Sequence, residues 1–145
     1  QPAILDHVLK AICFRRSTTL GWVEIWRNFP LARPMSFTIL APVAGDEIAL
    51  YLDRASRLVA AKGVRVGGTS VDNVELLTGT SRATGTNLLL NATQDITSTT
   101  TGDVLSLAAD PDIAAGSWVW LKVGAVVGTV TSVTIGAVII DGNYV

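Results

Sequence analysis

The sequence predicts an all-β protein: an antiparallel β-sandwich of jelly-roll-like form, preceded by a short N-terminal helix and an extended arm. From residue 35 onward, β-branched and aromatic residues recur in short runs. Gly, Pro and Asp interrupt these runs at intervals of about ten residues, which divides the region into about eight to ten short strands. No long helical period separates the runs, and this argues against a mixed α/β fold.

The individual strands follow from alternation and from turn residues. Ser36–Leu40 precedes Pro42, Glu47–Leu52 alternates, and Leu58–Val66 runs into the turn Gly67–Gly68. The Ala-containing segment Ser56–Lys62 is compatible with a helical turn, and we assign it to a strand. Later strands are expected at Val74–Leu77, Asn87–Asn91, Val104–Leu107, Ser117–Val123, Thr129–Ile135 and Ala137–Ile140.

The core of the sandwich is expected on the aliphatic face of these strands, because successive strand residues point to opposite sides. The predicted core residues are Ile39, Ile48, Leu50, Leu52, Val64, Val66, Val119, Leu121 and Val123.

Residues 1–34 are predicted to form a separate attachment region before a sandwich domain at residues 35–145. Apolar residues at helical spacing, among them Leu5 and Leu9, predict an amphipathic helix over Ala3–Phe14. A helix of about three turns is marginal alone, so it must dock either on its own domain or on a neighbouring subunit.

The segment Arg15–Pro34 is expected to be an extended arm. It carries Trp22 and Trp26, which need a hydrophobic surface to cover them. Pro30 and Pro34 exclude a central strand at its end. The arm therefore joins the predicted helix as a candidate contact region.

The composition favours a protein that buries surface against neighbours. Of 145 residues, 16% are charged and 49% are apolar, with a mean hydropathy of +0.45. Membrane insertion is the alternative, but no apolar run approaches the roughly 18 residues of a spanning helix. Low charge with extra apolar area is typical of interface-rich subunits. The net charge of −1 and the scattered basic residues argue against nucleic-acid binding.

The residues that usually carry catalysis or bind metals are few. Cys13 and His7 are the single cysteine and histidine, and no third group is evident to orient them, so a buried, unreactive Cys13 is favoured. Asp110 and Asp112 flank Pro111, where a turn is favoured over a Ca²⁺ site that would need six to eight oxygen ligands. The stretch 63–69 lacks the lysine and helix of a phosphate loop. We expect no enzyme activity, metal or cofactor.

Trp118 and Trp120 form the most conspicuous aromatic pair. Alternation places both on one face of their strand with Lys122, opposite the aliphatic core face. Three interpretations remain open: rings buried by a second layer or beneath a loop, rings packed against another subunit, or rings that stack on a sugar.

The segment from Phe37 to about Ile135 resembles small β-sandwich domains of tailed-bacteriophage structural proteins. The resemblance rests on Phe37–Tyr51, Gly63–Ser70, Ser98–Val104 and, most specifically, the small-residue turn and Trp-x-Trp strand of Ile113–Leu121. It does not cover the region before Met35. Such domains act as packing or binding modules on phage heads, tails and fibres.

The resemblance implies a non-enzymatic virion structural protein. The expected role is a capsid decoration protein on the capsid exterior that contacts the major capsid protein, other virion proteins or sister subunits in a homo-oligomer. The alternative is a head- or tail-fibre domain that binds a host-surface glycan. Contacts with membrane or nucleic acid are not expected. The predicted interface residues are Trp22, Trp26, Leu5, Leu9, Trp118 and Trp120.

Overall fold

The computed structural model divides the chain into two compact units, residues 1–31 and residues 32–145. The structure describes residues 2–7, 10–17, 21–28, 31–83 and 86–142, with side chains from residue 32 onward. In the described parts of the chain, no helix is long and apolar enough to cross a membrane.

The N-terminal unit is a three-stranded antiparallel sheet of β1 (Pro2–His7), β2 (Lys10–Ser17) and β3 (Gly21–Asn28), in the order β1-β2-β3. The helix predicted over Ala3–Phe14 is therefore wrong, because the described residues of that range, 3–7 and 10–14, belong to β1 and β2. Short apolar runs do not distinguish helix from strand by spacing alone, and this one contains the strand formers Ile, Val and Phe.

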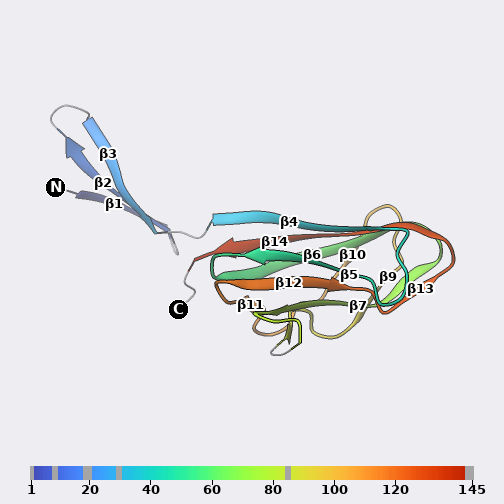
Figure 1. Cartoon of the computed structure of the whole chain (residues 1–145). Helices are drawn as coiled ribbons and strands as arrows, with labels where there is room; N and C mark the ends of the chain where they lie inside the picture. Colours follow the sequence, from blue (N-terminus) through green and yellow to red (C-terminus); the bar gives the residue numbers. More distant parts are fainter. Residues whose placement is uncertain (1, 8–9, 18–20, 29–30, 84–85, 143–145) are drawn as a thin grey trace. The chain divides into compact units, whose positions relative to one another are not determined.

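The second unit is the predicted antiparallel β-sandwich (Figure 1). Its longer strands are β4 (Leu31–Leu40), β5 (Glu47–Leu52), β6 (Ser56–Gly67), β7 (Ser70–Gly79), β12 (Ser117–Lys122) and β14 (Val130–Asp141). Its shorter strands are β8 (Asn87–Leu88), β9 (Gln94–Ile96), β10 (Asp103–Val104), β11 (Asp112–Ile113) and β13 (Ala125–Val127). The strand assignment of Ser56–Lys62 is confirmed.

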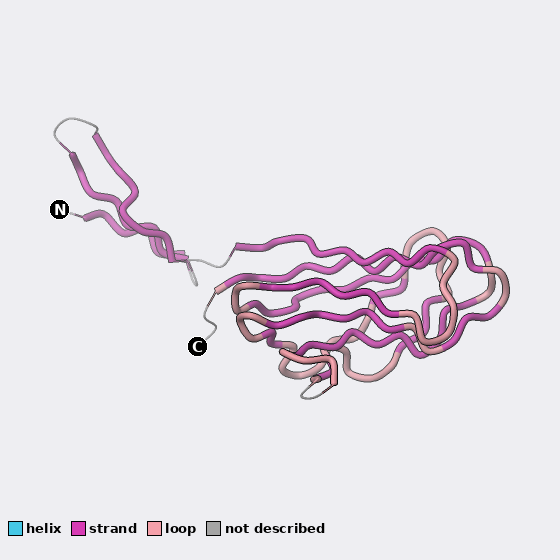
Figure 2. The backbone as a smooth tube through the Cα atoms, in the orientation of Figure 1, coloured by secondary structure: helices cyan, strands magenta, loops and turns pink. Residues whose placement is uncertain are grey.

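The two sheets have the strand orders β10-β6-β14-β4 and β13-β7-β12-β5. Strand β11 adds to β6, and strands β8 and β9 add to β7. The chain changes sheet between β4 and β5, between β5 and β6, and between β6 and β7. In the two strand orders, β4 and β5 are end strands. Figure 2 shows that this unit consists of strands joined by loops and turns. As an end strand, β4 accommodates Pro34, which has no N–H to donate to a further strand.

The sandwich is held by a core between the two sheets. Its largest fully buried side chains are Phe37, Leu58, Leu76, Leu89, Leu90, Ile96, Ile113, Leu121, Ile135 and Ile139. Of the predicted core, Leu52, Val119, Leu121 and Val123 are confirmed as buried, and Ile39 packs partly buried against them.

Two predicted core positions on β6 are wrong. Val66 is 55% exposed and Val64 is only half-buried. The cause is a β-bulge: the pairing of β14 with β6 shifts register between Val138 and Ile139, so Val59 is the extra residue. A bulge inverts the faces of the residues that follow it. Arg65 therefore faces inward, where its Nη1 donates to the carbonyl oxygens of Gly67 and Gly68.

The predicted core positions Ile48 and Leu50 are also wrong, for a different reason. Ile48 and Leu50 lie on the same face of β5 as the buried Leu52, but their side chains are 37% and 39% exposed. Among the described strands only β12 pairs with β5, so the sheet ends there and leaves these side chains partly uncovered.

Candidate interaction surfaces

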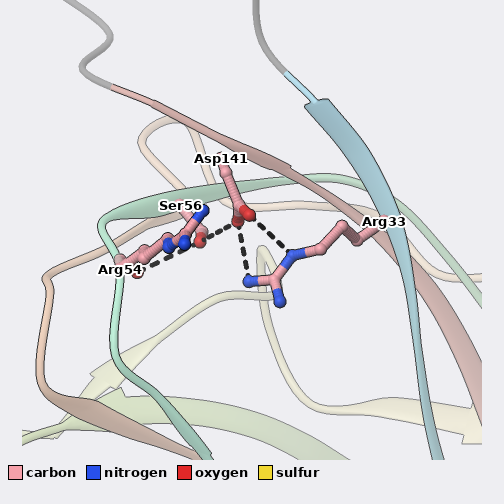
Figure 3. A network of polar contacts seen from close by, with 4 residues as sticks. All are labelled: Arg33, Arg54, Ser56 and Asp141. Carbon is pink, nitrogen blue, oxygen red and sulfur yellow. Dashed lines mark hydrogen bonds and ion pairs between the residues drawn. The ribbon is translucent and has the colours of Figure 1, made fainter.

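A polar network joins the first and the last strand of the sandwich unit, β4 and β14 (Figure 3). Arg33, near the start of β4, pairs with Asp141 at the end of β14: Nε lies 2.6 Å from Oδ2, and Nη2 donates to Oδ1 at 2.8 Å. Ser56 Oγ donates to the same Oδ1 at 2.8 Å and lies 3.2 Å from the carbonyl oxygen of Arg54. Asp141 is buried, so these contacts replace the water that its carboxylate has lost.

This network has a structural role. It fixes the first strand of the sandwich to the last strand, directly after the point at which the chain leaves the N-terminal unit. The paired fork geometry of Arg33 and Asp141 stabilises one relative position of β4 and β14.

The exposed side of β5 is the first apolar surface, which we call the β5 edge. It consists of Ile48, Leu50 and Tyr51 on the strand, with Leu40 at the end of β4 and Val43 in the connection between β4 and β5. Leu40 and Val43 are 75% and 59% exposed. From residue 34 to residue 52 the charged residues are Asp46 and Glu47 alone, a pattern that was visible in the sequence and was not used to predict a surface.

The two tryptophans of β12 differ in their surroundings. Trp118 is 41% exposed and packs its ring against Tyr51, with centroids 5.2 Å apart at 61°. Trp120, on the same face, is 5% exposed. Arg82, between β7 and β8, pairs with Glu47 of β5 at 2.9 Å, so its segment reaches across β12 on this face. This fits the interpretation of a ring beneath a loop for Trp120, and Trp118 remains a contact candidate.

The second apolar surface is a groove on the outer face of the sheet β10-β6-β14-β4, which we call the outer groove. It holds about 620 Å³. Small residues of β6 and β14, Ala60 and Gly136, line it together with Pro34, Val104 and Val138. Lys62 is its charged residue, and Nζ of Lys62 donates to the carbonyl oxygen of Thr101 at 3.0 Å.

The candidates for catalysis and metal binding do not form a site in the part of the chain that is described. Asp110 and Asp112 lie 3.8 and 3.3 Å from the guanidinium of Arg57, and no cluster of three or more metal-ligating residues occurs among the described residues. The register of β1 and β2 sets Cys13 opposite Ile4 and His7 opposite Lys10. The backbone thus offers no direct pairing of Cys13 with His7.

Asp103 organises the turn that precedes β10. Its Oδ2 accepts hydrogen bonds from the backbone N–H groups of Ser98 and Thr97, at 2.8 and 2.6 Å. These bonds favour the ionised carboxylate and lower the pKa of Asp103 below its ordinary value. The bond from Ser98 has the largest effect, and the bond from Thr97 follows it. The turn over residues 97–101 therefore has a specific side-chain anchor.

The other predicted interface residues lie in the N-terminal unit. Leu5 belongs to β1, and Trp22 and Trp26 belong to β3. Leu9 lies outside the described residues. Their assignment to an interface stays a prediction.

Comparison with known proteins gives one structural likeness. No family model matches the chain, and no curated protein matches it. The fold is similar to a chain in the structure of infectious bursal disease virus, Gt strain, with a TM-score of 0.43 and 13% sequence identity. The alignment covers 94% of this chain and 44% of that chain, so this chain spans less than half the length of the viral one.

Proposed function

We propose that this protein is a non-enzymatic structural subunit of a bacteriophage particle. In this proposal it is a decoration protein on the capsid exterior that strengthens the shell through contacts with the major capsid protein and with sister copies. It uses no cofactor. The sandwich contributes outward-facing contact surfaces, and the N-terminal unit contributes attachment.

The observation that carries this proposal is the uncovered apolar surface of the sandwich. Large exposed apolar residues gather at the β5 edge and around the outer groove, which includes Val59, Val104 and Val138. Contiguous apolar surface on a soluble domain is typical of protein contact sites. The low charged fraction of 16% and the sequence resemblance to phage sandwich domains support the same assignment.

The proposal is tested on particles that lack the protein. Shells of the phage that encodes the chain are purified from a mutant without it, and the purified full chain is added back. We expect stoichiometric binding in sedimentation assays and a higher thermal transition of the shell in calorimetry. Absence of binding, or binding that leaves shell stability unchanged, contradicts a decoration role.

Substitutions separate the attachment region from the sandwich. Trp22→Ala combined with Trp26→Ala is expected to weaken shell binding at least about tenfold, because buried aromatic residues dominate most interfaces. Trp118→Ala, which removes an exposed tryptophan of the sandwich, is compared in the same assay, and a smaller loss of shell binding is expected for it. Circular dichroism checks that each variant retains its β structure.

One observation favours a second candidate function, a fibre domain that binds a surface glycan. The exposed faces of Trp118 and Tyr51 are aromatic surfaces of the kind on which sugars stack. In that case Trp118→Ala abolishes binding to host-cell glycans in an array, and the variant altered at Trp22 and Trp26 binds normally. The same set of variants thus distinguishes the two candidates.

A further inference from the structure

Strand β5 is an unpaired sheet edge. It pairs with β12 along its whole length, from Glu47 opposite Lys122 to Leu52 opposite Ser117. Among the described residues, no strand pairs with its other side. An edge of this kind offers a row of backbone donors and acceptors to a further strand.

The hydrogen bonds identify the backbone groups on the open side. The carbonyl oxygens of Asp46 and Leu52 accept from Val123 N and Gly116 N, at 2.9 and 3.0 Å, so they point toward β12. Because backbone groups alternate in direction along an antiparallel strand, the N–H and C=O groups of Glu47, Ala49 and Tyr51 point away from β12.

Strand β5 also lacks most of the features that usually prevent edge pairing, since its one charged residue, Glu47, stands at its first position and pairs with Arg82. Strand β5 contains no lysine, no proline and no shift in its register with β12. Its inward-facing Ile48 and Leu50 are more than one-third exposed. A strand added here would gain backbone hydrogen bonds and cover apolar side chains at the same time.

We propose that β5 pairs with β5 of a second copy, antiparallel, with Ala49 on the two-fold axis. This inference rests on the proposed function in that it names the contact through which sister copies join. The β13-β7-β12-β5 sheets of the two copies then form one continuous sheet across the dimer. The interface is isologous, as in most symmetric dimers.

The sequence of β5 is self-complementary in this register. Ile48 faces Leu50 of the second copy on the core side, so each exposed aliphatic residue covers the other. Glu47 faces Tyr51, and no carboxylate opposes another. A shift by two residues in one direction would set Glu47 opposite Asp53 and place like charges across the strands, which is destabilising. The shift in the other direction would set the carboxylate of Asp46 opposite the aliphatic side chain of Leu50.

We infer that the occupant is a second copy rather than an unrelated strand, because β5 supplies both things that the edge needs. These are backbone groups to pair with the open side and aliphatic side chains to cover Ile48 and Leu50. The outward residues Glu47, Ala49 and Tyr51 pair among themselves under the two-fold axis. Residues directly opposite each other in an antiparallel pair point to the same face of the sheet, so the core faces of the two copies lie on the same side. No other partner sequence is needed to satisfy the edge.

The test measures the mass of the purified full chain in solution by sedimentation equilibrium over a wide range of concentrations. The edge variant is Leu50→Lys, and the matched control is Val66→Lys, which places the same charge on an exposed valine of the outer face of β6. We expect a dimer for the wild type and the control. Burying an unpaired ammonium raises the dissociation constant of Leu50→Lys about 100-fold or more.

Two results overturn the proposal: a wild type that is monomeric at every concentration, or a Leu50→Lys variant that dimerises like the control. Circular dichroism confirms that both variants are folded, and a Leu50→Lys variant that fails to fold is replaced by Leu50→Thr, for which a weaker dimer is expected and an unchanged dimer counts against the proposal. The assay contains no particles. A dimer that does not bind shells contradicts the proposed function alone, and a monomer that binds shells contradicts this inference alone.

Discussion

At the scale of single residues, β12 shows how alternation sets the core face of a strand, although Trp120 on the opposite face is also buried. Val119, Leu121 and Val123 have no exposed surface, whereas the intervening Lys122 is half-buried and pairs with Glu75 at 3.6 Å. Leu121 stands between β5 and β7, opposite Ile48 and Leu76. It lies in the interior of the sheet β13-β7-β12-β5, where the structure around it has little room to relax.

We predict that Leu121→Ala lowers the free energy of unfolding by about 2 to 5 kcal/mol, since it removes buried contacts and leaves a cavity. The neighbouring Lys122→Ala should cost less than about 1 kcal/mol, because its ion pair with Glu75 is partly exposed to solvent. Urea unfolding of both variants measures the difference. Equal losses would mean that the facing of β12 is misassigned.

A glycine pair on the other sheet gives a second residue-scale prediction. A Cβ on Gly63 would lie 2.5 Å from Cδ1 of the fully buried Ile96, whereas a Cβ on Gly136 would have no atom within 4 Å. Gly63→Ala should therefore destabilise the sandwich by about 1 to 3 kcal/mol through overpacking. Gly136→Ala, the control on the paired strand β14, should be neutral or slightly stabilising in thermal unfolding.

At the scale of elements, the turn before β10 depends on one carboxylate. The side chain of Asp103 replaces backbone partners for the N–H groups of Ser98 and Thr97, and Ser98 Oγ in turn accepts from Gly102 N at 2.9 Å. Backbone bonds from the segment continue into β6, where Arg65 N donates to the carbonyl oxygen of Ser98. The turn is thus tied to a main strand of the sandwich.

This arrangement predicts a pH dependence with a definite sign. The pKa of Asp103 in the folded protein lies below its ordinary value of 3.8, so the ionised form stabilises the fold. That contribution is fully present above the unfolded-state pKa and is lost as the pH falls through the lower, folded-state pKa. Asp103→Asn should therefore be less stable than wild type at neutral pH, with a gap that closes in acid.

Urea unfolding of both proteins from pH 7 down to about pH 2 measures that gap. Asp110→Asn is the control at neutral pH, because Asp110 is 88% exposed and lies 3.8 Å from its partner Arg57. A gap between wild type and Asp103→Asn that is the same at every pH would show that the carboxylate does not stabilise the turn by its charge.

At the scale of the whole molecule, the division into two units is the main feature. The network of Arg33, Ser56 and Asp141 lies entirely within the sandwich unit. Removal of residues 1–31 therefore leaves these contacts between β4, β6 and β14 in place. Three strands with a hydrophobic face are about the minimum for a sheet that is stable by itself, whereas the sandwich has a core between two sheets. The two units therefore differ in what they require from their surroundings.

We predict that deletion of residues 1–31 leaves a folded sandwich that no longer joins particles. Far-ultraviolet circular dichroism and cooperative thermal unfolding check the fold, and sedimentation with shells that lack the protein checks attachment. A truncated protein that binds shells at full occupancy contradicts the attachment role of the N-terminal unit. A truncated protein that is unfolded would show that the sandwich depends on that unit.

The sequence by itself determined the fold class and much of the core. The short runs of β-branched residues and the turn at Gly67–Gly68 predicted an antiparallel sandwich, and Leu52, Val119, Leu121 and Val123 were found on its core side. These features are local: alternation and turn chemistry act over a few residues, so a single sequence displays them.

Tertiary structure alone decided the rest. The bulge at Val59 exchanged the faces of β6, the end position of β5 exposed Ile48 and Leu50, and strand pairing replaced the helix expected over Ala3–Phe14. Burial of Trp120 and exposure of Trp118 likewise depend on which segment crosses β12. Each of these outcomes is set by partners distant in sequence, and the spacing of apolar residues along one segment carries no information about such partners.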